Sequence, residues 1–316
     1  MRLRLHIVVT VMLLTLSIAS AALPERAQAQ TNPACSASVR VALGESEQTL
    51  EHDGRDRAYL LYIPEGYDPT QPTPLVISIH GFASSASQQR TFSGWNDLAD
   101  EHGFVVAYPQ GTGFPSAFYF LPANRETLVD DQDFISTLID TLSASLCIDT
   151  RRVYVNGLSN GGAMSISVAC ALNDKVTAIG IVAGAYSALL DFYIQRCEAE
   201  RPMPLIAFHG TEDTVVPYEG GSSGGFSFVP YEQWTEAWAA RNECTTVEAL
   251  PAEGVVGGTR YSDCMAEVIA YTVEGGGHTW PGSELELEFL GLTTQDIDAS
   301  AAMWEFFMQY QLETEQ

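Results

Sequence analysis

The residues that could carry out chemistry are a serine, a histidine and a carboxylate spread over the second half of the chain. The segment Gly157-Leu158-Ser159-Asn160-Gly161-Gly162 contains the pattern G-x-S-x-G between a strand-like run and a small-residue helical run. A serine at such a turn can attack a carbonyl carbon when a base removes its proton. The pattern occurs twice more within 220–225, where no strand-like run precedes it. We therefore predict Ser159 as the nucleophile and residues 220–225 as a flexible surface loop.

The base must be a histidine that follows the nucleophile, because this type of turn carries its triad in the order serine, acid, histidine. Of the six histidines only His209 and His278 follow Ser159. His209 ends a buried-looking strand and precedes the acid candidates, so we interpret it as structural. His278 comes after Gly275-Gly276-Gly277, and these glycines allow a loop to return the imidazole to the sheet edge. His278 is the predicted general base.

The acid should lie on the loop after the penultimate core strand. The segment from His209 to Pro217 supplies two carboxylates, Glu212 and Asp213, and the pattern alone leaves the choice between them open. The acid has to hold the imidazole in the correct tautomer and stabilise the imidazolium that forms.

Two backbone N–H groups are needed to stabilise the oxyanion. One should belong to Asn160, the residue after the nucleophile, and the other to the loop His80-Gly81-Phe82-Ala83, where Phe82 is the expected donor. Gly81 permits the sharp bend that this loop requires. The mechanism implies no metal and no organic cofactor.

These residues need a parallel sheet to bring them together. The chain alternates apolar runs, typical of strands buried on both faces, with helical stretches. The predicted strands are 58–63, 74–80, 104–108, 153–155, 176–183, 204–208 and 267–273. The predicted helices are 87–102, 131–146, 161–172, 231–241 and 294–311, with Asp130, Asp131 and Asp133 as caps of the second. This rhythm predicts a doubly wound, mostly parallel α/β sheet with helices on both faces.

The charge balance excludes some partners and the start of the chain indicates export. The 316 residues hold 40 Asp and Glu against 15 Lys and Arg, a net charge of −25, which argues against nucleic acid and against an anionic membrane. Residues 1–29 have the basic start, apolar run and Ala27-Gln28-Ala29 end of a secretory signal peptide. We expect 30–50 to be a loose lead-in segment and 51–316 a single catalytic domain. The sequence says nothing firm about oligomeric state.

Six cysteines in an exported chain suggest disulfides. Strand-like segments around Cys244 and Cys264 could form a hairpin, which favours that pair. The other four could pair as Cys35–Cys147 and Cys170–Cys197, although one or two buried thiols remain an alternative. The spacings match no zinc site.

With these motifs in place, the chain resembles the secreted esterases grouped with polyhydroxybutyrate depolymerases and B-type feruloyl esterases, in the α/β-hydrolase superfamily. The resemblance covers about residues 55–310 and rests on these landmarks in order: 57–64, His80-Gly81, 93–96, Asp130-Asp131, Arg152-Val153-Tyr154 before the Ser159 turn, His209-Gly210-Thr211 with Asp213, and Gly277-His278-Thr279-Trp280-Pro281-Gly282. It implies Asp213 rather than Glu212 as the acid. It also places Cys244 and Cys264 where relatives commonly carry cysteines.

The stretch 118–124 departs from the Trp-Asn pair and adjacent cysteines that many relatives carry, so the family does not supply the substrate. Trp280, with Phe82 and the run 118–120, could form an aromatic slot for a hydroxycinnamoyl ring. Because no linker or adsorbing domain is visible, we favour a secreted esterase of feruloyl groups on plant-wall polysaccharide. A polyhydroxyalkanoate or its oligomers, an acetyl ester, or a non-catalytic secreted binding protein remain alternatives.

Overall fold

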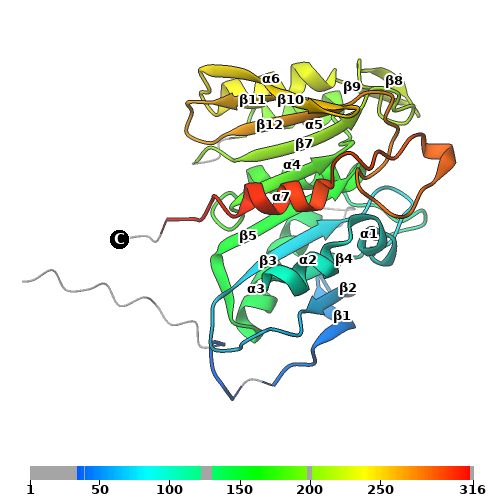
Figure 1. The fold of residues 1–316 in the computed structure, drawn as a ribbon. Coiled ribbons are helices and arrows are strands. Elements are labelled where there is room, and N and C mark those ends of the chain that lie inside the picture. The colour runs from blue at the N-terminus through cyan, green and yellow to red at the C-terminus, as the bar shows by residue number, and fades with distance from the viewer. Residues whose placement is uncertain (1–33, 39, 122–129, 198–200, 314–316) are drawn as a thin grey trace, which may run out of the picture. The chain divides into compact units, whose positions relative to one another are not determined.

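A ten-stranded sheet runs through the computed structural model, which describes residues 34–38, 40–121, 130–197 and 201–313 (Figure 1). Its strands are β1 (Gly44–His52), β2 (Arg55–Ile63), β3 (Thr73–Ile79), β4 (Val105–Pro109), β5 (Ile148–Leu158), β6 (Ala178–Val182), β7 (Leu205–Gly210), β10 (Thr246–Glu253), β11 (Val256–Ser262) and β12 (Val268–Val273). The order across the sheet is β1-β2-β4-β3-β5-β6-β7-β12-β11-β10.

The central strands β4, β3, β5, β6, β7 and β12 are mutually parallel. Antiparallel strands extend the sheet at each edge. β2 and then β1 follow β4 at one edge, and β11 and then β10 follow β12 at the other. The predicted doubly wound, mostly parallel α/β-hydrolase sheet is confirmed. The parallel strands end at one edge of the sheet, where the loops that follow them gather, on the right-hand side of Figure 1.

Helices cover both faces of the sheet and create two apolar cores. They are α1 (Ala86–Ser93), α2 (Trp95–His102), α3 (Asp131–Ser145), α4 (Asn160–Ala171), α5 (Ala188–Ile194), α6 (Tyr231–Arg241) and α7 (Ala299–Phe307), with a 3-10 turn η1 (Glu288–Leu290). Side chains of α3, α4, α5 and α6 join one core, and those of α1, α2 and α7 join the other. Along β3, Leu75 and Ile77 enter the first core and Val76 enters the second. This alternation explains why the central strands are apolar throughout.

Three local predictions needed correction. The lead-in segment already contains β1, an edge strand with only a few buried side chains, so its apolar pattern is weak. The single helix predicted for 87–102 is divided at Gly94, whose positive φ of 61° ends α1 and precedes α2. The predicted flexible loop 220–225 belongs to a short hairpin, β8 (Gly221–Ser223) with β9 (Phe226–Phe228).

The three expected disulfides, Cys35–Cys147, Cys170–Cys197 and Cys244–Cys264, are all formed. The third closes the predicted hairpin, because Cys244 precedes β10 and Cys264 follows β11. The first joins the N-terminal segment to the residue before β5. Each crosslink limits the conformations of the unfolded chain.

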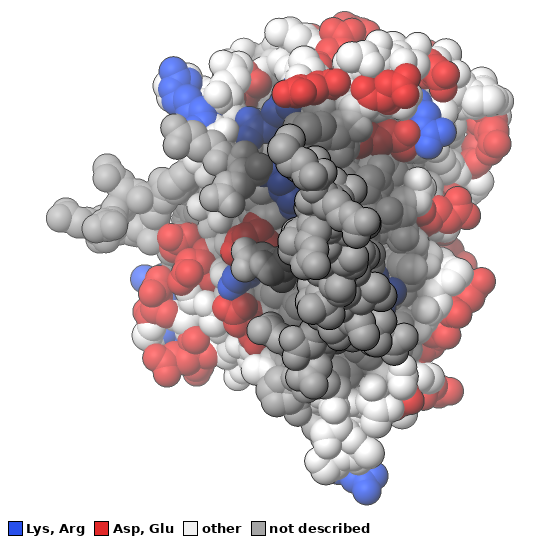
Figure 2. Space-filling model, turned by 90° about the vertical axis from the view of Figure 1, so that its left-hand side faces the viewer, with Lys and Arg blue, Asp and Glu red and all other residues white. Residues whose placement is uncertain are grey.

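Residues 32–316 form one compact unit, and the predicted signal peptide lies outside the described residues. In the part of the chain that the structure describes, no helix combines the length and apolar character required to cross a bilayer. Figure 2 shows acidic side chains spread over one face, with few basic ones between them. The surface seen there has the sign expected from the net charge of −25.

Candidate active site

Ser159 occupies a strained turn between the end of β5 and the start of α4. Its φ of 57° and ψ of −114° lie in a region that residues with a side chain seldom adopt. A Cβ atom on Gly157 would collide with the main chain of Gly161, and one on Gly161 would collide with the main-chain oxygen of Ile79. The two glycines are therefore required by the close approach of strand, turn and helix, which projects the serine from the end of the strand.

Main-chain hydrogen bonds hold the turn in place. The N–H of Ser159 donates to Val182 O at 2.9 Å, and its carbonyl accepts from Ala163 N at 2.9 Å and from Ala185 N at 3.1 Å. The serine side chain is half-buried at the N-terminal end of α4.

Asp213 and His278 form an acid–imidazole pair. Nδ1–H of His278 donates to Asp213 Oδ2 at 2.7 Å. The other carboxylate oxygen accepts from the N–H groups of Val215 and Val216, both at 2.8 Å. Because Nδ1 carries the proton in this bond, Nε2 of the neutral ring is free to accept one. Glu212 is exposed, so the geometry selects Asp213 as the carboxylate that contacts His278.

The environment keeps Asp213 ionised although only 5% of the residue is exposed. Burial by itself would raise the pKa of this carboxyl, but the hydrogen bond and charge of His278, with smaller contributions from His209 and the Val216 N–H, hold it below its ordinary value. A carboxylate that stays charged can orient the imidazole and stabilise its protonated form.

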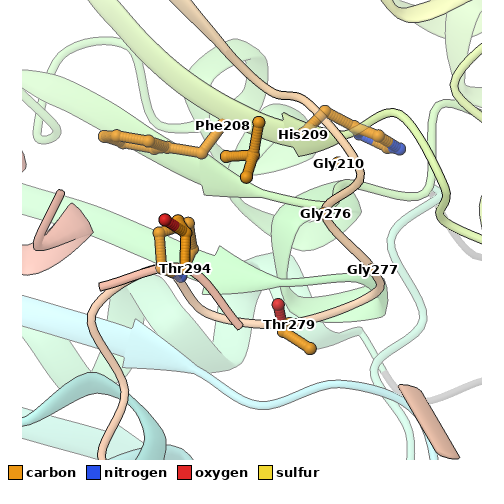
Figure 3. Close-up of a pocket in the computed structure, with 9 residues that line it drawn as sticks. Phe208, His209, Gly210, Gly276, Gly277, Thr279 and Thr294 are labelled. Carbon is orange, nitrogen blue, oxygen red and sulfur yellow. The ribbon is translucent and has the colours of Figure 1, made fainter. Parts of the chain in front are cut away.

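Close backbone packing brings His278 back to the sheet edge. A Cβ on Gly210 would collide with Gly276, and one on Gly277 would collide with Leu290. His278 N–H donates to Leu290 O at 2.7 Å. Figure 3 shows the resulting loop passing the end of β7, where Phe208, His209, Gly210, Gly276, Gly277 and Thr279 are among the residues that line a pocket.

Ser159, Asp213 and His278 thus follow β5, β7 and β12, strands of the same parallel array, and they come to one sheet edge. No hydrogen bond joins Ser159 Oγ to His278 among the described residues. Within those residues no group of three His, Cys, Asp or Glu side chains could hold a metal ion.

The two expected oxyanion donors lie beside the serine. An added Cβ on Gly81 would be 3.4 Å from Ser159 Cβ, so the loop after β3 touches the turn. His80 Nδ1–H donates to Gly81 O at 2.7 Å, which orients the peptide that carries the Phe82 N–H. In the described chain, neither Phe82 N–H nor Asn160 N–H donates to a protein acceptor.

Trp280 does not occupy the place expected of an aromatic wall. It is 2% exposed, packs in the core on the α7 side, and its indole N–H donates to Ser300 Oγ at 3.1 Å. A ring enclosed in this way has no free face for a substrate, so the structure favours a packing role. Phe118 is likewise buried, whereas Phe82 and Tyr119 are 62% and 42% exposed.

Two further histidines belong to the surroundings of the site. His209 Nε2 donates to Val216 O at 2.8 Å and lies 3.4 Å from Asp213 Oδ2, which agrees with the predicted structural role. Burial lowers the pKa of His209 and of His80 to about 4. The role of the His80 side chain was not predicted from the sequence, in which the one signal for it is the position of His80 directly before Gly81.

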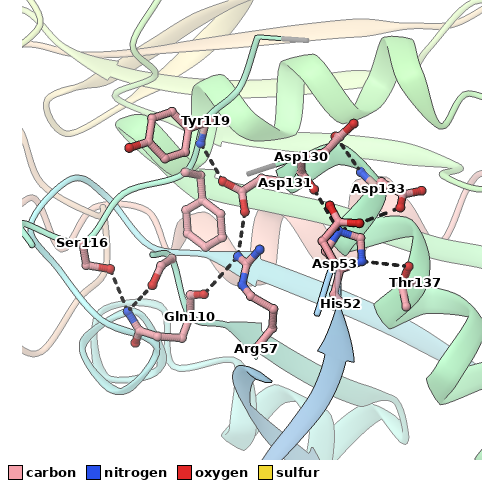
Figure 4. Close-up of polar contacts among 12 residues, drawn as sticks. His52, Asp53, Arg57, Gln110, Ser116, Tyr119, Asp130, Asp131, Asp133 and Thr137 are labelled. Atoms are coloured by element: carbon pink, nitrogen blue, oxygen red, sulfur yellow. Dashed lines mark hydrogen bonds and ion pairs between the residues drawn. The ribbon is translucent and has the colours of Figure 1, made fainter. Parts of the chain in front are cut away.

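The surroundings of Asp131 also differ from the prediction. Asp130 is the N-cap of α3 and accepts from Asp133 N at 3.1 Å, as expected of a cap. Asp131 is instead fully buried and accepts from Arg57 Nη2 at 2.6 Å and from Tyr119 N at 2.7 Å (Figure 4). Its role is to bind a distant strand and loop together.

The known proteins that this chain resembles include several esterases. A family model described as Esterase PHB depolymerase matches residues 57–196. The chain is 28% identical over 248 residues to feruloyl esterase B of Piromyces equi, which covers 74% of this chain but only 45% of that protein. It is 28% identical over 320 residues to feruloyl esterase D of Neurospora crassa, which covers 95% of this chain and 97% of that one.

Among solved structures, the acetyl xylan esterase from Aspergillus awamori matches with a TM-score of 0.61 at 16% identity, over 83% of this chain and 99% of that chain. At this identity the likeness shows the fold alone. The chain spans less than half of the length of the Piromyces equi relative.

Proposed function

We propose that the chain belongs to the esterase family of polyhydroxybutyrate depolymerases and B-type feruloyl esterases and that it is a secreted serine hydrolase of feruloyl esters on plant-wall polysaccharide. The observation that carries the proposal is the buried hydrogen bond between Asp213 and His278 at the same sheet edge as the strained Ser159 turn. The three disulfides fit an oxidising compartment.

In the proposed mechanism, Ser159 gives its proton to His278 and attacks the ester carbonyl carbon. Asp213 stabilises the imidazolium that forms, and the N–H groups of Phe82 and Asn160 bind the oxyanion of the tetrahedral intermediate. The intermediate collapses as His278 protonates the departing alcohol, which leaves an acyl group on Ser159. Water then gives a proton to His278 and attacks the acyl carbon, and the acid is released with the serine restored.

The feruloyl assignment rests on the relatives and on exposed aromatic rings near the site. Two of the relatives reported above are feruloyl esterases. Phe82 carries an expected oxyanion donor, and Tyr119 follows the residue that is bonded to Asn160. Their exposed rings could stack on a hydroxycinnamoyl group, the role first expected of Trp280. The family-model match keeps a polyhydroxyalkanoate oligomer as the second candidate substrate.

The test measures kcat/KM on methyl ferulate and on a 3-hydroxybutyrate oligomer, with Ser159→Ala as the blank. We expect methyl ferulate to be preferred, and Ser159→Ala to lower kcat on the order of 10⁴-fold or more without unfolding. A strong preference for the oligomer would replace the substrate assignment. Near-normal turnover by Ser159→Ala would remove the nucleophile, and absence of fluorophosphonate labelling at Ser159 in the native chain would indicate a non-catalytic fold.

A further inference from the structure

The two expected oxyanion donors lie on separate elements, so something has to set their spacing. Phe82 lies on the loop after β3, and Asn160 is the first residue of α4. A shift of about 1 Å in a group that contacts the reacting atoms can cost roughly 100-fold in rate. The segment that touches both donor elements is the loop 110–120, which follows β4 and is called the bracing loop here.

One end of the bracing loop is bound to the Phe82 side. Ser116 O accepts from Ala83 N at 2.8 Å, one residue beyond the expected donor. His80, which orients the Gly81 carbonyl, accepts from Gly111 N at 3.0 Å through Nε2. The Gln110 amide completes this contact by donating to Ser116 Oγ at 2.8 Å.

The other end is bound to the nucleophile side by the side chain of Asn160. Oδ1 accepts from Phe118 N at 2.8 Å, and Nδ2 donates to Phe118 O at 3.0 Å. The residue is only 9% exposed. Because both bonds use the side-chain amide, the backbone N–H of Asn160 remains available for the substrate oxygen.

The next residue of the loop is held as well. Tyr119 N donates to the fully buried carboxylate of Asp131, which is paired with Arg57, and Figure 4 shows this junction beside the Gln110–Ser116 contact. The bracing loop is thus fixed to β2, α1, α3 and α4 rather than lying free over the site.

We propose that the bracing loop sets the spacing of the oxyanion hole and that the Asn160 side chain is the positioning residue that joins it to the nucleophile turn. The inference rests on the proposed ester hydrolysis and adds a role that the triad does not supply. Because an oxyanion forms during hydrolysis of every ester, loss of the bonds between Asn160 and Phe118 should reduce turnover whatever the acyl group.

The chain offers a matched control at the other end of the same helix. Asn173, just beyond α4, binds the main chain of Arg201 in the same way, with Oδ1 accepting at 3.0 Å and Nδ2 donating at 2.9 Å. It is 7% exposed, close to the value for Asn160. Asn173→Ala therefore removes equivalent bonds far from the expected donors.

The experiment compares Asn160→Ala with Asn173→Ala on p-nitrophenyl acetate and methyl ferulate, with melting temperatures measured alongside. We expect Asn160→Ala to lower kcat ~10- to 100-fold on both esters with KM within about twofold, below the cost of losing a whole donor. Binding of phenylboronic acid, which forms a tetrahedral adduct on the serine, should weaken in parallel. Asn173→Ala should lose comparable stability and keep its kcat within about twofold.

Equal kcat values in the two variants would overturn the proposal. A rise in KM for methyl ferulate alone would also overturn it, because the loop would then be only a wall for the ring. If Asn160→Ala does not fold, Gln110→Leu tests the other end of the bracing loop with the same expected pattern. An inactive native chain that fails to react with a fluorophosphonate would instead contradict the proposed ester hydrolysis.

Discussion

The pKa values of two buried carboxylates near the same sheet edge are shifted in opposite directions. Asp213 is 5% exposed and accepts from two backbone N–H groups and the His278 ring. Asp131 is 0% exposed and accepts from Arg57 and one backbone N–H. The pKa of Asp213 lies below its ordinary value, whereas burial raises the pKa of Asp131 despite the Arg57 charge and the Tyr119 N–H.

The difference follows from the donors and from the nature of the partner. More N–H groups point at Asp213, so its charged form recovers more of the hydration lost on burial. Its partner is an imidazole, which can gain and lose a proton, whereas the guanidinium of Arg57 stays charged. The Asp213 region is therefore suited to proton transfer and the Asp131 region to holding elements together.

The largest expected effect separates the two carboxylates by activity. Asp213→Asn should lower kcat about 10⁴-fold, because the amide favours the wrong imidazole tautomer. Asp131→Asn should reduce kcat by about tenfold or less, since Asp131 acts only through the bracing loop. Initial rates on methyl ferulate measure both. Similar losses in the two variants would remove the distinction between a proton-transfer region and a structural one.

The second effect concerns stability, for which we expect Asp131 to matter more than Asp213. Asp131→Asn should lower the free energy of unfolding by about 1–3 kcal/mol, because the amide NH2 leaves one of the buried N–H donors of Arg57 and Tyr119 without an acceptor. The double variant Arg57→Met with Asp131→Leu should regain part of that loss, because no buried charge remains although the Tyr119 N–H still lacks its acceptor. Urea unfolding of the three proteins is the measurement. A double variant no more stable than Asp131→Asn would show that the pair contributes more than mutual neutralisation.

The smallest effect is in the pH dependence of the unfolding free energy. As pH falls, the contribution of Asp213 to stability decreases and that of Asp131 increases. The lowered pKa of Asp213 contributes stability above the unfolded value of about 3.9, and this is lost as pH falls through the folded value. The raised pKa of Asp131 contributes stability below about 3.9 that is lost as pH rises through its folded value.

Unfolding free energies measured between about pH 5 and pH 3 should therefore separate the variants. Asp213→Asn should flatten the loss of stability below about pH 4, and Asp131→Asn should steepen it above about pH 4. Parallel curves for both variants and the native chain would mean that the two environments do not differ in the way described.

Much of the candidate site could be predicted because its signals are local. The Gly157–Ser159–Gly161 spacing reports a turn that only glycines allow, and the glycines before His278 report a tight loop. The apolar runs identified the central strands because those strands are buried on both faces. Edge strand β1 escaped prediction because few of its side chains are buried.

The strained turn at Ser159, the parallel sheet and the order of the candidate triad could be predicted from the sequence, because backbone sterics and apolar periodicity act between near neighbours. Residue spacing left the choice between Glu212 and Asp213 open, and the folded chain brings Asp213 into contact with His278. The packing of Trp280 in the core and the bonds between Asn160 and Phe118 likewise appear only in the folded chain. The same holds for the pairing of Arg57 with Asp131, 74 residues away. Such contacts depend on how whole helices and strands pack against one another, and this packing cannot be predicted from the spacing of residues along the chain.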